Sequence, residues 1–281
     1  MATTLFTILR KAYLALGQME VTTATGGSTT TVVDTKLTES FGDDDLVNCS
    51  VFVIRDAGGA SAAPEGEVGV VSDNVQSTGT LTLRAALTTA VAVGDTVGIV
   101  KNVWPLYTMI EIVNDALASL GTIQLVDTSL TTVSGQTEYA LPVTLKHKVT
   151  NVQIQTNTET SNNEYADMNN WYIVPAAAGA TGLLIFQVEP ESGLTLKVWY
   201  EAEHPRLSAM SDVLSETIHS ELATRLVVDR ALEYQTRRTS GTDQFLLQTA
   251  NKAMQDVEMA RRAFSVPKRR HAKILTPGTG E

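Results

Sequence analysis

The sequence predicts an α+β protein in which a helical bundle carries two β-rich modules, each a small barrel or sandwich. Apolar residues recur at helical spacing near both ends and in the middle of the chain, whereas the two long stretches between them alternate with period two and contain many turns. The length of 281 residues fits one large domain or two to three small ones, and 43% hydrophobic residues can supply a core.

The first expected element is a helix over residues 3–17, within an N-terminal segment 1–19 that belongs to the bundle. Its apolar residues recur at intervals of three and four, and Gly17 is a natural stop. These apolar residues are Leu5, Ile8, Leu9, Ala12, Tyr13 and Leu16.

An inserted β-module is expected at 20–103. Short alternating stretches are separated there by turn-rich sequences such as "GDDD" and "AVAVGD", which is typical of a small barrel or sandwich. The five expected strands lie in "TTTVVD", "CSVFVIRD", "GEVGVVSD", "GTLTLRA" and "DTVGIV".

The middle helix of the bundle is expected at 104–121, opened by Trp104 and Pro105 and ended by Gly121. A second β-module follows at 122–205, with prolines at the ends of its strands, where a missing N–H does least harm. Its expected strands lie in "TEYALP", "VTNVQIQT", "NNWYIVP", "GLLIFQV" and "LTLKVWYEA".

The C-terminal helices of the bundle are expected at 206–264. The first starts after Ser211 or Asp212, and its apolar residues repeat every four positions; the second starts at Thr242 or Asp243. The apolar residues of the first are Met210, Leu214, Ile218, Leu222 and Leu226, and those of the second run from Leu246 to Phe264. Because no single helix of this kind is stable alone, we expect all the helices to pack together.

The charge balance argues against a protein that binds nucleic acid by neutralising phosphates. The formal net charge is −10, so most of the surface would repel DNA, although this does not exclude a protein that must let DNA pass without sticking. Cys49 is the single cysteine, which excludes an intrachain disulfide. Residues 1–17 do not resemble a secretory signal, and the longest apolar run, 174–186, is too short for a membrane span. We expect a soluble protein made in a cytoplasm, without a membrane partner.

The search for catalytic chemistry is negative, so we expect no enzyme, no catalytic residue, no metal and no cofactor. The sequence holds no phosphate-binding loop and no nucleophile elbow. The histidines His147, His204, His219 and His271 do not have metal-ligand spacing. Consecutive carboxylates at 43–45 point in different directions, which favours a turn cap over a calcium loop.

Other segments are candidates for contacts with partners. The glycine- and alanine-rich loop 56–67 is either a plain hairpin loop or a loop that orders on assembly. Trp171 and Tyr172 are neighbours in a strand and face opposite sides, so one belongs to a core and the other either lies at the rim of that core, which is the default, or serves as an interface anchor. Glu233 and Arg237 form a helical ion pair on a face that is solvated unless it lies in an oligomer wall.

The last segment, 265–281, is expected to be an extended C-terminal arm. Its interpretation stays open between a solvated end, a contact with nucleic acid, and an arm that adds a strand to a partner. The apolar pair Ile274 and Leu275 favours strand addition to a partner, because a tail that only touches DNA does not need apolar side chains. The candidate residues for partner binding are Lys268, Arg269, Arg270, Lys273, Ile274 and Leu275.

The order of elements resembles that of the head–tail connector, or portal adaptor, proteins of tailed bacteriophages. The likeness rests on "LFTILRKAYLALG", "WPLYTMIEIVNDALASLG", "QTEYALP" before a β-block, and the helical end from "LSAMSDVLSETIHSELATRLVVDRALEY". It covers most of the chain as a pattern of elements and not as a sharp motif. The large β-module at 20–103 departs from the smaller members of that family.

The resemblance implies a structural virion protein in the neck, at the head–tail interface, made in the cytoplasm of a host bacterium. Copies would form a cyclic ring, a dodecamer by resemblance, under the portal protein and above a downstream neck or tail protein, with DNA as passing cargo. The segment 265–281 would then be the portal-binding arm. Alternatives are another virion component, such as a tail, baseplate or decoration protein, and a hydrolase or carbohydrate-binding module built on the β-blocks.

Overall fold

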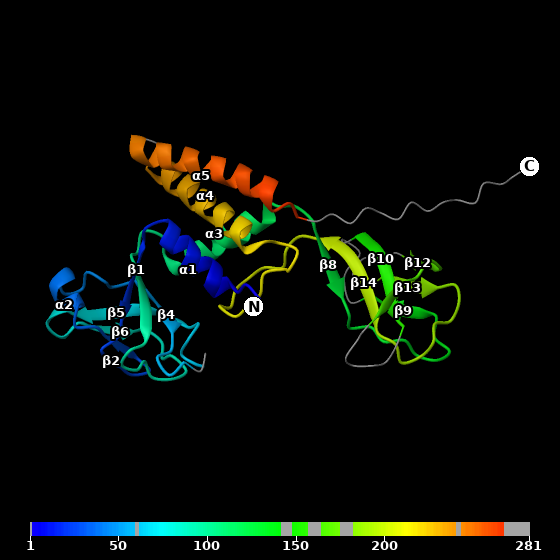
Figure 1. The fold of residues 1–281 in the computed structure, drawn as a ribbon, viewed down its shortest axis with the longest axis horizontal. Helices are drawn as coiled ribbons and strands as arrows, with labels where there is room; N and C mark the ends of the chain where they lie inside the picture. Colours follow the sequence, from blue (N-terminus) through cyan, green and yellow to red (C-terminus); the bar gives the residue numbers. More distant parts are fainter. Residues whose placement is uncertain are drawn as a thin grey trace, which may run out of the picture. The chain divides into compact units, whose positions relative to one another are not determined.

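The chain forms two compact units in the computed structural model (Figure 1). The first unit comprises Met1–Ser119 and Pro205–Ser265, and the second is built on Leu120–His204. The structure describes residues 2–59, 62–141, 148–156, 164–174, 182–239 and 243–266.

The predicted helical bundle is wrong. The structure is mostly antiparallel β-sheet, arranged as one seven-stranded, one four-stranded and one three-stranded sheet, and its short helices do not form a bundle. The reason is that an apolar stripe shows which face of a helix is buried but not what covers it. Here α4 is packed by other helices, whereas α1 divides its apolar face between α4 and the seven-stranded sheet.

Helix α1 (Leu5–Ala15) illustrates this division. Its N-cap is Thr4, whose hydroxyl accepts a hydrogen bond from the Thr7 amide at 3.3 Å. Two of its aromatic side chains contact Phe52 of the sheet: the ring of Phe6 lies 5.5 Å from it and the ring of Tyr13 lies 5.7 Å from it. Such aromatic pairs add to the free energy gained by burial alone, so the sheet helps to hold the helix in addition to α4.

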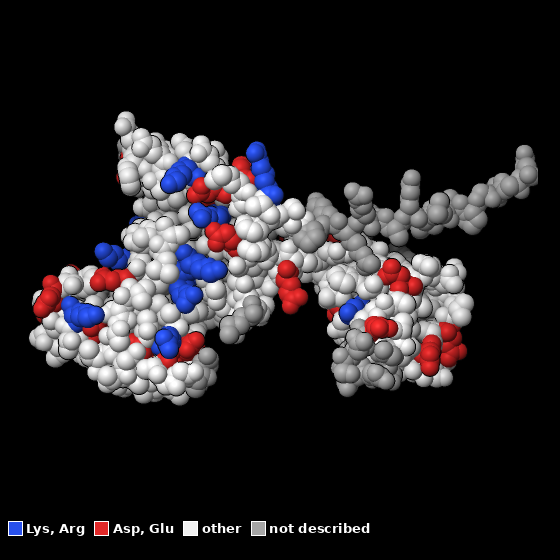
Figure 2. All heavy atoms as spheres, in the orientation of Figure 1, with Lys and Arg blue, Asp and Glu red and all other residues white. Residues whose placement is uncertain are grey.

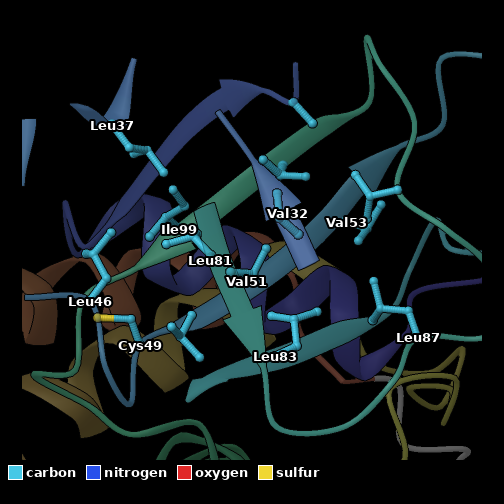
Figure 3. Close-up of a cluster of buried hydrophobic side chains, with 14 residues drawn as sticks. Val32, Leu37, Leu46, Cys49, Val51, Val53, Leu81, Leu83, Leu87 and Ile99 are labelled. Atoms are coloured by element: carbon cyan, nitrogen blue, oxygen red, sulfur yellow. The ribbon is translucent and has the colours of Figure 1, made fainter. Parts of the chain in front are cut away.

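The seven-stranded sheet has the strand order β1-β7-β4-β5-β6-β3-β2, with all neighbours antiparallel. Its strands are β1 (Met19–Thr23), β2 (Gly26–Gly27), β3 (Thr31–Val33), β4 (Ser50–Arg55), β5 (Val68–Val75), β6 (Thr80–Leu83) and β7 (Thr96–Val100), and the short helices α2 (Leu37–Ser40) and η1 (Gln76–Thr78) lie in its connections. Figure 3 shows Val32, Val51, Leu81 and Ile99 converging on one apolar core from four different strands.

The helices of the first unit that follow the sheet are α3 (Leu106–Ala118), α4 (Ser220–Arg238) and α5 (Gln244–Ala263). Helix α4 contacts α1, α3 and α5. The prediction that α4 starts after Ser211 or Asp212 is wrong, because the helix begins at Ser220 with His219 as its N-cap. The preceding segment pairs instead with the N-terminal residues, where the Leu214 amide donates to the Thr3 carbonyl at 2.8 Å.

The second unit contains the other two sheets. The four-stranded sheet has the order β11-β10-β14-β8 and the three-stranded sheet the order β12-β13-β9. Their strands are β8 (Ile123–Asp127), β9 (Glu138–Ala140), β10 (Lys148–Gln155), β11 (Tyr165–Asp167), β12 (Trp171–Val174), β13 (Leu183–Phe186) and β14 (Leu196–Ala202). One core cluster, which includes Tyr139, Val152, Phe186 and Val198, takes residues from both sheets.

No helix in the part of the chain that the structure describes is both long and apolar enough to cross a membrane. The surface of the helical region carries basic and acidic side chains close to one another, as Figure 2 shows for the face turned to the viewer.

Candidate interaction surface

The helix pair α4–α5 forms the most exposed apolar surface of the first unit. Helix α5 starts at the N-cap Asp243, whose carboxylate accepts hydrogen bonds from the amides of Phe245 and Leu246 at 2.9 and 3.1 Å. It buries only Ala253, Val257 and Ala260, whereas large apolar side chains elsewhere on the helix face solvent. The exposed ones are Phe245 (78%), Met259 (61%), Met254 (57%) and Leu247 (36%).

A groove of about 470 Å³ runs between α4 and α5. Its apolar part is formed by Leu226 of α4 with Leu247, Met254 and Val257 of α5. Its rim is charged, with both signs on both helices: Asp229, Arg230, Glu233 and Arg237 on α4, and Glu258 and Arg261 on α5. An apolar floor with a charged rim is the usual composition of a site that receives another protein segment.

Ion pairs hold the α4 side of the groove in place. Glu233 accepts from Arg230 at 2.7 Å and also pairs with Arg237, so the predicted Glu233–Arg237 ion pair is confirmed. Hydrogen bonding from Arg230 lowers the pKa of Glu233. Burial raises the pKa of Asp229 in the groove, although the charges of Arg230 and Arg261 oppose that effect.

The end of α5 is anchored where the predicted arm begins. The ring of Phe264 stacks on the ring of His219, with centroids 3.9 Å apart and planes 3° from parallel, and the Phe264 amide donates to the Ala260 carbonyl at 2.8 Å. His219 is the N-cap of α4, and its Nδ1 accepts from the Glu221 amide at 3.2 Å. The predicted arm residues Lys268, Arg269, Arg270, Lys273, Ile274 and Leu275 lie outside the described residues, so only the base of the arm is seen.

The acidic turn at 43–45 and Cys49, which were considered as candidate sites in the sequence, have structural positions in this fold. Asp45 accepts from the Gly42 amide and Asp43 from the Gln76 amide, both at 2.7 Å, which confirms the turn-cap interpretation. Cys49 is buried, and burial raises the pKa of its thiol. Within the described ranges, no group of three or more His, Cys, Asp or Glu side chains is arranged to hold a metal ion. His147 and His271 lie outside those ranges.

The loop 56–67 connects β4 to β5 as a hairpin. In its described part, the Asp56 carboxylate accepts from the Gly58 amide at 3.0 Å and the Glu65 carboxylate accepts from the Asp56 amide at 3.1 Å. The second of these bonds joins the two described ends of the loop.

The four-stranded sheet of the second unit presents a polar row that sequence reasoning missed. Asp167 accepts from the side-chain amides of Asn151 and Gln153, both at 2.8 Å, and Gln153 accepts from the Trp199 indole N–H at 2.7 Å. In the sequence, this polar row is indicated only by the alternation of apolar and polar residues in β10. On the three-stranded sheet, Trp171 packs against the core and Tyr172 is 48% exposed, as the sequence predicted for this pair.

Comparison with known proteins identifies the family. The family model of the SU10 adaptor protein matches residues 80–271, well over half of the 281 residues, whereas no curated protein matches the chain. Adaptor proteins of this kind are structural components of the phage virion. The match confirms the predicted likeness at the level of phage adaptors, and the chain therefore belongs to the SU10 adaptor protein family, a family of bacteriophage adaptor proteins.

Proposed function

We propose that the protein is the head–tail adaptor of a tailed bacteriophage. Copies form a ring in the neck of the virion, beneath the portal protein and above a downstream neck or tail protein, and the ring provides a channel through which DNA passes. The observation that carries this proposal is the family match, which extends from β6 to residue 271 and includes α3, the second unit, α4 and α5. In this role the protein has no catalytic site and needs no cofactor.

The proposed contact with the portal is the C-terminal arm. Its residues Lys268, Arg269, Arg270 and Lys273 are basic, and Ile274 and Leu275 are suited to strand addition at an exposed sheet edge. Fully extended, residues 265–281 would span up to about 55 Å, which is enough to reach a neighbouring ring. The stacking of Phe264 on His219 gives this arm a fixed starting point.

The charge of the chain supports the channel part of the proposal. A net charge of −10 in each copy would multiply around a ring and repel the phosphate backbone, so DNA would slide without adhering. The basic arm does not defeat this effect, because the portal would cover it.

Co-sedimentation with the portal ring of the same phage tests the proposal. We expect the full chain to pellet with the portal in ring stoichiometry and a chain that stops after Val266 to stay in the supernatant. This truncation keeps Phe264 on His219, so the helix pair remains intact. A chain with Ile274→Ser and Leu275→Ser keeps all the basic residues of the arm. If it stays in the supernatant, binding depends on the apolar pair and strand addition; if it pellets with the portal, charge attraction is sufficient.

One result would argue against this function, and another would argue only against the role of the arm. If the full chain does not bind the portal at any concentration, the adaptor role in the neck is wrong, and a tail, baseplate or decoration role takes its place. If the truncated chain binds as well as the full chain, the adaptor role stands, but the arm is not the portal contact.

A further inference from the structure

Helix α5 has apolar side chains on two opposite flanks, and only the face between them is buried against α4. At about 100° per residue, Phe245 and Met254 lie about 180° apart around the helix. Ala253, Val257 and Ala260, which are buried, lie between these two flanks. A helix that only closes a monomer needs one apolar face, so the second and third apolar surfaces of α5 need another explanation.

The first flank belongs to the groove described above. Leu247, Met254 and Arg261 follow one another at intervals of seven residues and line the groove from the α5 side, with Glu258 at its rim. We call this surface the groove flank. Glu258 is exposed and, among the described residues, makes no ion pair.

The second flank carries Phe245, Lys252 and Met259, again at intervals of seven residues. We call it the ridge flank. Phe245 and Met259 are the two most exposed apolar side chains of α5, and Lys252 between them is exposed and likewise has no ion-pair partner in the described part of the chain. Figure 2 shows mainly uncharged atoms over the first half of α5 on the face turned to the viewer.

We infer that the ridge flank of one copy packs into the groove flank of the next copy of this chain. This inference rests on the proposed ring. A ring requires a heterologous interface, in which each copy uses two different surfaces, and α5 offers two such surfaces on opposite sides. The partner is a second copy because each flank offers what the other can bind: the exposed ring of Phe245 fits an apolar groove, and Lys252 fits Glu258 on a rim that carries both signs of charge.

The spacing along the helix agrees with this pairing. In a ring of many copies each copy is rotated by only a small angle relative to its neighbour, so copies of α5 are nearly parallel, and an α5 inclined to the ring axis is offset along its length from the next copy. A shift of six residues, about 9 Å at 1.5 Å per residue, brings Lys252 opposite Glu258. The same shift places Phe245 opposite Asn251, between Leu247 and Met254 in the groove, and Met259 opposite the end of the helix. One shift therefore serves both the charged pair and Phe245.

A charge exchange tests the pairing in the full chain. We expect Lys252→Glu and Glu258→Lys each to weaken self-assembly on the order of tenfold or more, and the double variant to restore it. Arg262→Glu is the matched control, because it makes the same change of charge on the face of α5 that points away from α4. Assembly is measured by sedimentation velocity and native mass spectrometry, alone and with portal rings.

A mixing experiment tests whether the interface is heterologous. Phe245→Asp removes the ridge flank and Met254→Asp removes the groove flank, so neither variant should form rings alone. An equimolar mixture should give a 1:1 dimer that does not grow further, because one intact ridge flank meets one intact groove flank. Both side chains are largely exposed, and melting temperatures close to that of the wild type will show that the variants are folded.

The outcomes separate this inference from the proposed function. If the wild type forms rings and the single charge variants do so equally well, or if the double variant fails to recover, the interface lies elsewhere while the adaptor role stands. If Met254→Asp leaves self-assembly intact and abolishes portal binding, the groove receives the portal and the inference is wrong. If the wild type forms no ring alone or with portal, the proposed function and the inference both fail.

Discussion

Tyr13 links three parts of the first unit, and its hydroxyl group is the most informative single group to remove. The side chain is fully buried, and its O–H donates to the Trp104 carbonyl at 2.9 Å. The Trp104 indole N–H in turn donates to the Ala231 carbonyl of α4 at 3.1 Å. These two bonds connect α1, the entry to α3, and α4.

Tyr13→Phe keeps the ring against Phe52 but leaves the buried Trp104 carbonyl without its donor. A buried unsatisfied acceptor costs about 1–3 kcal/mol, so we expect the free energy of unfolding at pH 7 to fall by that amount. Urea unfolding followed by circular dichroism measures the change. Tyr107→Phe is the control: Tyr107 is 75% exposed, and losing its hydroxyl should change stability by less than about 0.5 kcal/mol.

The pH dependence gives a second, independent measure. Burial raises the pKa of Tyr13 in the folded protein above the value of about 10 in the unfolded chain. Its contribution to stability is therefore complete below pH 10 and is lost as the pH rises towards the folded pKa. The difference in stability between the wild type and Tyr13→Phe should shrink by about 1.4 kcal/mol between pH 9 and pH 11.

The reasoning would be refuted by equal stability of the wild type and Tyr13→Phe at pH 7. It would be refuted equally by a stability difference that stays constant from pH 9 to pH 11.

Three further predictions concern the same unit. Asp243→Ala removes the N-cap of α5 and should cost about 1 kcal/mol and speed amide exchange in its first turn, whereas Asp243→Asn should keep most of the cap. Gly79→Ala should lower the free energy of unfolding in urea by about 2 kcal/mol or more, because Gly79 has a φ of +61° and a Cβ there would collide with the Asp34 carbonyl oxygen. Gly17→Ala is the control and should lower it by less, because Gly17 has a similar φ of +65° but open space around its Cβ position. Asp229→Asn should raise the melting temperature at pH 7, because burial raises the pKa of this carboxyl in the folded protein and its ionised form therefore destabilises the fold. The difference in melting temperature between the variant and the wild type should shrink as the pH is lowered towards 4, near the unfolded pKa of about 3.9.

The sequence predicted central strands well and edge strands poorly. All ten expected strands are present, whereas β1, β2, β8 and β11 were missed. These four are the edge strands of the seven-stranded and four-stranded sheets. An edge strand has one neighbour and less burial, so its alternation of apolar and polar residues is weak and its sequence resembles a linker.

The helices show a second limit of sequence reasoning. The four-residue spacing from Met210 to Leu226 suggested one helix, but the half before Ser220 is held by backbone hydrogen bonds to the N-terminal residues instead. Spacing alone does not show such a long-range partner. The groove between α4 and α5 could not be predicted for the same reason, because its lining comes from two helices whose packing depends on buried alanines.

The pairing of strands at the ends of the β-blocks has a consequence for how this chain can change. In the first block, β1 pairs with β7 so that Met19 lies opposite Val100; in the second, β8 pairs with β14 so that Ile123 lies opposite Ala202. Each block therefore begins and ends at nearly the same point in space. Because the entropy cost of closing a loop rises only slowly with its length, the second block should accept insertion, exchange or shortening without disturbing the contacts among α1, α3 and α4. The first block must keep the strand that carries Phe52, because α1 packs on that side chain. A phage lineage can thus vary the second block, and the first block away from Phe52, while it keeps the helices.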